Sequence, residues 1–261
     1  MWRKAIILVV VTFLVSGCSD TRKTRATEIA VEYIEENFYQ EMIHIQTHII
    51  PIPIIYVIYG VTHRVYFHPV DMPELEFYVA LSPGDYSVRG DAYYSSYFCL
   101  QMKDYFNSSV CDIWGGDALL EVLTTGGSYS QWWTPQDYDR HEPIQESLEE
   151  MAAVFYSNNS DAVYYFEFQI NIERALTDDL IIADESQKIY EFIRVLQESN
   201  FEPINLILYY NKPHPTLLER LFNDTQIEIN FRQWQFETNN DWLSIETVEQ
   251  VIDIIASDEL D

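Results

Sequence analysis

Four side chains between residues 137 and 142 form the best local group of metal-binding donors in the sequence. They are Asp137, Asp139, His141 and Glu142, three carboxylates and an imidazole within six residues that show no regular hydrophobic period. Calcium takes six to eight oxygen ligands, and carboxylates on loops commonly supply them. This segment lacks the D-x-[DN]-x-[DN]-G pattern of a calcium-binding loop. A calcium site is therefore one interpretation, and a solvated acidic surface is the other.

Other catalytic or metal-binding patterns are weak. His44 and His48 lie four residues apart, but no third ligand lies near them, and the sequence contains no H-E-x-x-H, no G-x-S-x-G and no phosphate-binding loop. A chain with 42 acidic residues always contains carboxylate pairs, so no single pair indicates glycoside hydrolysis. We assign no catalytic residue and favour a function without catalysis.

Large aromatic residues gather in the same irregular part of the sequence. Tyr129, Trp132, Trp133 and Tyr138 lie among Gly, Ser, Pro and polar residues. Large aromatic side chains on polar loops favour contact with a protein or a sugar. We take these four as candidate partner-binding residues, although the same rings would also fill a seam between two halves of the protein.

The charge of the chain excludes one class of partner. The 261 residues include 15 Lys and Arg and 42 Asp and Glu, a formal charge of −27. Nucleic acids are bound through concentrated basic patches, and we find none in the sequence, so we expect no nucleic-acid partner. Residues 131–261 hold seven basic and 27 acidic residues, so we expect this half to meet any charge-driven partner.

The first 18 residues follow the pattern of an export signal. Arg3 and Lys4 precede twelve mostly apolar residues, from Ala5 to Ser16. As a helix this stretch is about 18 Å long, which is too short for the ~30 Å hydrocarbon core of a bilayer. It therefore targets the chain and does not span a membrane.

Residues 15–18, Val-Ser-Gly-Cys, resemble the lipobox of bacterial lipoproteins. The resemblance implies that residues 1–17 are a cleaved signal peptide and that the Cys18 thiol carries a diacylglycerol, with a further acyl group on the new N-terminus. Residues 18–25 would then be a lipidated tether with cations at Arg22, Lys23 and Arg25. We expect no other cofactor, apart from the calcium ion that the group at residues 137–142 leaves open.

The resemblance also implies a location on the membrane, facing away from the cytoplasm. Together with the missing catalytic patterns, it leads us to expect a lipoprotein of the cell envelope that binds another envelope protein through its acidic half and the aromatic residues. An envelope hydrolase, or a lipoprotein that binds a small ligand or a cation, is the alternative.

Two further cysteines, Cys99 and Cys111, lie twelve residues apart. In an exported protein they could form a disulfide closing a short loop. Two buried free thiols are equally consistent with the sequence.

Hydrophobic periodicity predicts an α+β fold, with helices packed on small, mostly antiparallel sheets in two halves of similar size. The predicted helices are 27–42, 91–106, 143–156, 185–199, 213–222 and 245–256, and the predicted strands lie within 43–67 and at 75–81, 119–124, 162–172, 204–210 and 226–235. We place the domains at residues 26–130 and 131–261, because the irregular residues 126–143 separate the two patterns.

Overall fold

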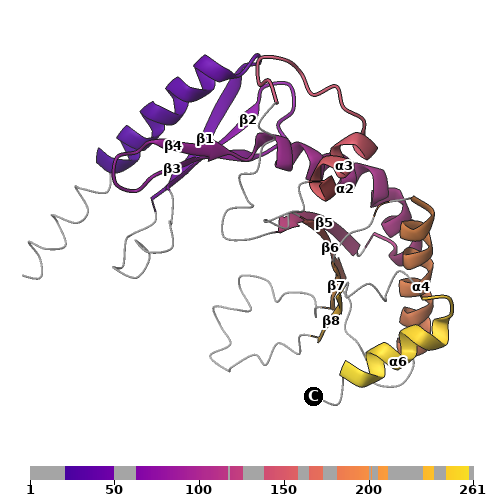
Figure 1. Ribbon diagram of the computed structural model, residues 1–261. Coiled ribbons are helices and arrows are strands. Elements are labelled where there is room, and N and C mark those ends of the chain that lie inside the picture. The colour runs from indigo at the N-terminus through magenta and orange to yellow at the C-terminus, as the bar shows by residue number, and fades with distance from the viewer. Residues whose placement is uncertain are drawn as a thin grey trace, which may run out of the picture. The chain divides into compact units, whose positions relative to one another are not determined.

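A computed structural model describes residues 21–49, 63–116, 118–125, 138–157, 165–172, 181–199, 201, 205–210, 232–237 and 245–258. The predicted α+β fold is confirmed, since helices accompany two small, mostly antiparallel sheets (Figure 1). The chain divides into two compact units, each assembled from separate segments. Unit 1 contains Met1–Phe98 and Gly127–Glu146, and unit 2 contains Cys99–Gly126 and Ser147–Asp261. The predicted boundary at residues 130 and 131 lies outside the described residues.

In the described residues of unit 1, a helix packs on a four-stranded antiparallel sheet. Its strands are β1 (Met42–His48), β2 (His63–Pro69), β3 (Phe77–Leu81) and β4 (Val88–Asp91), and they pair in chain order. One face of the sheet is apolar, because alternate side chains of β2 point to the same side and are buried. The helix, residues 21–37, contributes a matching stripe that recurs every four residues: Ala26, Ala30 and Ile34, continued just past its end by Phe38.

This helix begins earlier than the sequence analysis predicted. We expected a helix from residue 27 and a tether up to residue 25, but residues 21–25 are already helical. Ala26 is fully buried, so the apolar stripe starts one turn before the predicted first turn. Lys and Arg are also good helix formers. Residues 21–25 of the predicted tether are therefore part of the helix and place three cations on it, while residues 18–20 lie outside the described part of the chain.

Unit 2 holds a mixed four-stranded sheet. Its strands are β5 (Ala118–Thr125), β6 (Tyr165–Ile172), β7 (Asn205–Tyr210) and β8 (Arg232–Glu237), and they also pair in chain order. β6 and β7 run parallel, because helix α4 (Ile181–Ser199) crosses over between them, whereas the other two pairs are antiparallel. The near-continuous apolar run at residues 204–210 predicts an interior strand, and β7 confirms it.

The other labelled helices are α2 (Tyr93–Trp114), α3 (Leu148–Ser157) and α6 (Val248–Asp258). α2 ends where Gly115 adopts a φ of 83°, a left-handed conformation that commonly closes a helix. α3 starts five residues later than predicted, because Ser147 and Glu150 form a reciprocal capping box. Its start is thus set by the capping residue and not by Pro143.

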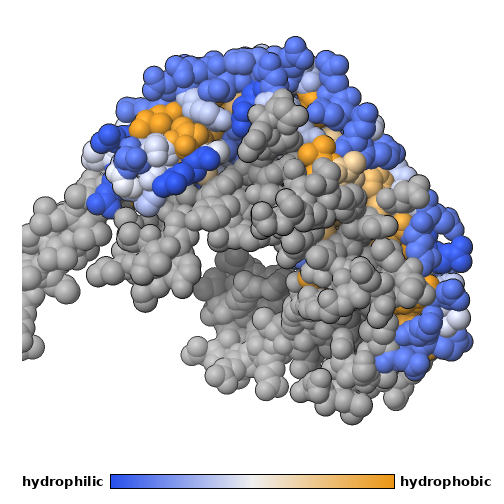
Figure 2. All heavy atoms as spheres, in the orientation of Figure 1, coloured by the Kyte–Doolittle hydropathy of each residue, from blue (hydrophilic) through white to orange (hydrophobic). Residues whose placement is uncertain are grey.

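Aromatic rings form the centre of unit 2. Phe106 of α2 lies 5.1 Å from Phe168 of β6 and 6.2 Å from Phe192 of α4, measured between ring centroids, and all three are fully buried. Hydrophilic residues cover most of the visible surface of the helix 21–37 and of α4 (Figure 2). None of the helices in the described ranges has the length and apolar composition to cross a bilayer.

Candidate functional site

The structure describes only some of the predicted partner-binding and metal-binding residues. Tyr129, Trp132, Trp133 and Asp137 lie outside the described residues. Tyr138, Asp139, His141 and Glu142 are described, and they belong to the segment 138–147 that precedes α3.

The described members of the acidic group form a local turn. The Asp139 carboxylate accepts a hydrogen bond from the backbone N–H of His141 at 2.9 Å, and its backbone carbonyl accepts one from the N–H of Glu142 at 3.2 Å. Across the ranges that the structure describes, no three His, Cys, Asp or Glu side chains are placed to hold a metal ion. Asp139, His141 and Glu142 therefore do not form a calcium site by themselves, since one carboxylate caps the turn and the other side chains are exposed.

Tyr138 packs into unit 1. Its ring stacks on Tyr93 at 6.4 Å between centroids and meets the Tyr94 ring edge-on at 5.2 Å. Burial raises the pKa of Tyr138, and its buried hydroxyl has no hydrogen-bond partner among the described residues. We call residues 129–138 the aromatic segment. Instead of presenting its ring to a partner, Tyr138 fixes the C-terminal end of this segment to the core of unit 1.

A buried ion pair holds the same segment two residues later. Arg140 Nε donates to Asp91 Oδ2 at 2.7 Å; Asp91 is fully buried, whereas the Arg140 side chain is 24% exposed. The Tyr33 hydroxyl donates to the same oxygen at 2.8 Å, and the Tyr93 backbone N–H donates to Oδ1 at 3.1 Å. The carboxylate thus joins the helix 21–37, the start of α2 and the segment 138–147, which is its structural role.

The electrostatics of this cluster agree with its geometry. Burial, then the Asp91 charge, raise the pKa of Tyr33, which keeps its hydroxyl protonated as the donor. Burial alone would lower the pKa of Arg140, but the adjacent Asp91 charge offsets this effect and the pKa is raised. Asp91 and Arg140 are 49 residues apart and belong to no motif, so the sequence analysis missed them.

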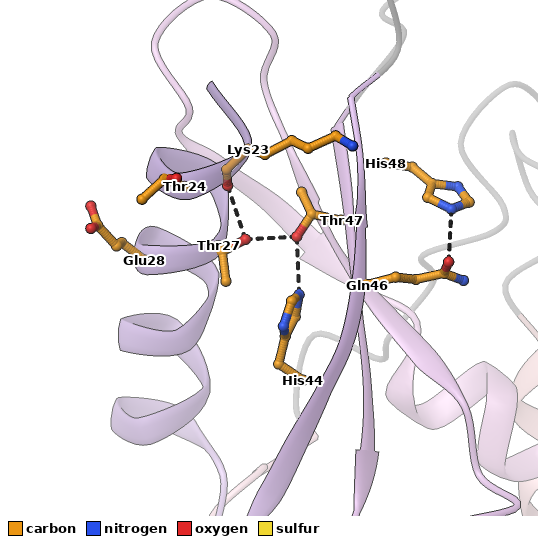
Figure 3. Close-up of a pocket in the computed structure, with 8 residues that line it drawn as sticks. All are labelled: Lys23, Thr24, Thr27, Glu28, His44, Gln46, Thr47 and His48. Carbon is orange, nitrogen blue, oxygen red and sulfur yellow. Dashed lines mark hydrogen bonds between the residues drawn. The ribbon is translucent and has the colours of Figure 1, made fainter. Parts of the chain in front are cut away.

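A groove of about 570 Å³ lies between the start of the helix 21–37 and the edge strand β1 (Figure 3). The helix contributes Lys23, Thr24, Thr27 and Glu28, and β1 contributes His44, Gln46, Thr47 and His48. Thr27 and Thr47 point toward one another across the gap, whereas Gln46 and His48 lie on the other side of β1 (Figure 3). The two histidines noted in the sequence therefore line one groove without facing each other.

Hydrogen bonds in the groove have a fixed direction. The Thr27 hydroxyl donates its only proton to the Lys23 carbonyl at 2.9 Å, so it must accept from the Thr47 hydroxyl at 2.6 Å. Thr47 then accepts from His44 Nε2–H at 3.0 Å. His44 is the donor and cannot act as a base toward Thr47, so this chain of hydrogen bonds does not activate a nucleophile. The groove offers a cation, a carboxylate and imidazoles to a bound group.

Of the two alternatives left open for Cys99 and Cys111, the structure contradicts the disulfide, because both thiols are free. Cys111 is exposed, so the two thiols are not both buried either. The two residues lie on the same helix, α2, twelve positions apart. At 1.5 Å per residue this is about 18 Å, far beyond the Cα separation of a disulfide. Burial raises the pKa of the Cys99 thiol to about 12, although hydrogen bonds with Thr124 act in the opposite direction.

Unit 2 contains its own buried carboxylate. Glu185 at the start of α4 is 1% exposed; its Oε2 accepts from Trp114 Nε1 at 3.1 Å and its Oε1 accepts from Lys188 Nζ at 2.7 Å. This group joins α2 to α4 inside unit 2. The sequence analysis does not single out Glu185, because its partner Trp114 lies 71 residues away in the chain.

Comparisons with known proteins assign no function to these groups. No family model and no curated protein matches the chain. The crystal structure of a DUF5037 family protein from Ruminococcus gnavus ATCC 29149 is similar over 87% of this chain and 86% of that one, with 12% sequence identity. The TM-score is 0.41, so the likeness carries no argument about family or activity.

Proposed function

We propose that the chain is an extracytoplasmic lipoprotein of the bacterial envelope, anchored by a diacylglycerol on Cys18, which binds another envelope protein without catalysing a reaction. The lipobox-like residues 15–18 supply the anchor, and two acyl chains suffice for stable membrane attachment. The acidic residues 131–261 would steer a partner with a basic surface.

One observation carries the partner-binding part of this proposal. The sequence that holds Tyr129, Trp132 and Trp133 is followed directly by Tyr138 and Arg140, which are fixed to unit 1 by ring stacking and by a buried ion pair. An aromatic segment with a rigidly held end costs less conformational entropy to order against a partner than a free loop. The directed hydrogen bonds of the groove, which leave Thr47 without a base, are consistent with a role in binding.

The anchor is tested by metabolic labelling with a fatty acid. We expect the wild-type chain to incorporate the label and Cys18→Ala to lose it and to leave the membrane fraction. Label on the Cys18→Ala chain, or its complete retention in membranes, would contradict the anchor.

The partner is tested on intact cells with a photo-crosslinking phenylalanine analogue. We would place it at Trp133 and, as a matched control, at Tyr105, an aromatic residue of α2 that is 52% exposed. We expect one reproducible protein adduct at position 133, absent at position 105 and diminished by high salt. Equal capture at both positions, or none at position 133, would contradict partner binding through the aromatic segment.

A further inference from the structure

One end of unit 1 gathers the start of the helix 21–37 and one end of each of the four described strands. His48 pairs with Arg64, His63 pairs with Leu81, and Leu81 pairs with Val88, so β1 ends where β2 begins and β3 ends where β4 begins. The start of the helix lies at this end too, because Thr27 bonds Thr47 and the Arg25 guanidinium lies 5.1 Å above the Tyr86 ring. We call residues 21–28, 48, 63–64 and 81–89 the basic end.

The charge of the basic end is opposite to that of the protein. Its cations are Arg22, Lys23, Arg25, Arg64 and Arg89, and its described acidic residues are Glu28 and Asp85. The whole sequence has only 15 cations, two of them in the predicted signal peptide, against 42 acids. Residues 50–62, which join β1 to β2, contain no acidic residue that would offset these cations.

The groove adds a concave part to this surface. Lys23 belongs both to the basic end and to the groove lining, which also includes His44 and His48 of β1 (Figure 3). The Lys23 ammonium is a donor without acceptor capacity, and such groups bind phosphate oxygens as point charges. At about 570 Å³, the groove is roomy enough for a phosphate group with its substituents.

The position of the basic end along the chain indicates which phosphates it meets. Three residue steps separate Cys18 from the first described helical residue, Thr21, and they span at most about 11 Å. Electrostatic interactions in physiological salt decay over about 8 Å. If Cys18 carries the proposed anchor, a step that rests on the proposed function, these cations stand within reach of the membrane surface.

We propose that the basic end of unit 1 is a membrane-contacting surface that binds anionic phospholipid headgroups through Arg22, Lys23, Arg25 and Arg89, with the groove receiving a headgroup phosphate at Lys23. The lipid anchor then does more than attach the protein: it delivers a complementary surface to the bilayer, while the acidic remainder of the chain is repelled from it. Anionic lipids orient unit 1 with its helix start toward the membrane.

Vesicle sedimentation tests this surface without the anchor. The mature Cys18→Ala chain, residues 18–261, is mixed with phosphatidylcholine vesicles or with vesicles containing phosphatidylglycerol. We expect binding only to the anionic vesicles, and we expect it to weaken as salt rises. Each cation near such a surface contributes about fivefold in affinity, so Lys23→Gln with Arg25→Gln should weaken binding about thirtyfold.

The matched control is Lys103→Gln with Arg194→Gln, which removes the same charge from α2 and α4 of unit 2. Arg194 makes an exposed ion pair with Glu198, and such pairs contribute little to stability. Circular dichroism verifies that both double variants are folded. Equal weakening by the two double variants, or equal binding to neutral and anionic vesicles, would overturn the proposal. Because the chain used is not lipidated, this result is independent of the fatty-acid labelling that tests the anchor.

Discussion

Both units bury a carboxylate beneath aromatic rings, but the two carboxylates join different parts of the chain. In unit 1, Asp91 receives Arg140 from a segment 49 residues away, together with Tyr33 of the helix 21–37. In unit 2, Glu185 receives Lys188 from the next turn of its own helix and Trp114 from α2. A buried carboxylate thus holds a segment that is distant in sequence in unit 1, whereas in unit 2 it orients α4 on α2. Losing the charge should accordingly have a wider structural effect in unit 1.

The largest expected effect comes from the core of each unit. Phe77→Ala in unit 1 and Phe106→Ala in unit 2 remove rings that are 1% and 0% exposed, and each should lower the free energy of unfolding by about 3–5 kcal/mol. Hydrogen exchange followed by mass spectrometry should show protection lost mainly in the unit that carries the substitution. Equal loss in both units from either variant would show that the units unfold as one.

The next effect distinguishes the two carboxylates. Asp91→Asn should lower the free energy of unfolding by about 3 kcal/mol, because it leaves the Arg140 charge without its buried partner. It should also expose the backbone of residues 138–146 to exchange. Glu185→Gln is the matched variant; its effect should be smaller, because Lys188 can turn toward solvent from a helix surface.

The result that would remove this contrast is simple. The contrast would be lost if Glu185→Gln lowered the free energy of unfolding as much as Asp91→Asn does. If residues 138–146 kept their protection from exchange in Asp91→Asn, the ion pair would not be what holds the segment.

Alkaline pH should weaken unit 1. Burial is the first cause of the raised pKa values of Tyr33, Tyr78, Tyr93 and Tyr138, so these hydroxyls are kept neutral in the folded state. Their contribution to stability is complete below pH 10, the ordinary tyrosine pKa, and is lost as the pH rises above it. Ultraviolet titration should show phenolate forming late and together with unfolding. Full ionisation of all tyrosines near pH 10 in the folded protein would contradict this burial.

The smallest effect concerns the two free thiols and leaves stability unchanged. Cys111 is exposed, whereas the pKa of Cys99 is raised to about 12 by burial, so very little Cys99 thiolate is present at neutral pH. A thiol reagent added to the native protein without prior reduction should label Cys111 roughly a hundredfold faster than Cys99. Absence of labelling until a reductant is added would indicate a disulfide after all.

The elements were predictable where the hydrophobic period was strong. β3, β5 and β7 follow from short, strongly apolar runs, and the helix α4 follows from three- and four-residue spacing, since burial imposes these patterns. β4 was missed, because four residues containing Arg, Gly and Asp show no alternation. The start of α3 was misplaced, because hydrogen bonds of Ser147 and Glu150 set it, and the apolar pattern does not record them.

The candidate site was less predictable than the fold. Asp91, Arg140 and Tyr33 are ordinary residues until three distant segments bring them together, so no local spacing identifies them. The cations of the basic end come from the helix, β2 and β4, and only the strand register shows that they share one end. The histidine pair was noticed in sequence, but its groove needed the helix start to be placed opposite β1.

The discontinuity of the two units has a consequence for the order of events during synthesis. Unit 1 needs Gly127–Glu146, yet the 28 residues Cys99–Gly126 of unit 2 are made before this segment. At ~5–20 residues per second, Arg140 follows Phe98 by about 2–8 s. During that interval Asp91 lacks its ion-pair partner Arg140, and Tyr93 and Tyr94 lack the Tyr138 ring that packs on them. The nascent protein therefore passes through a stage in which nearly all of unit 1 has been made but its packing cannot be completed. A factor that binds nascent chains would encounter unit 1 in this incomplete state.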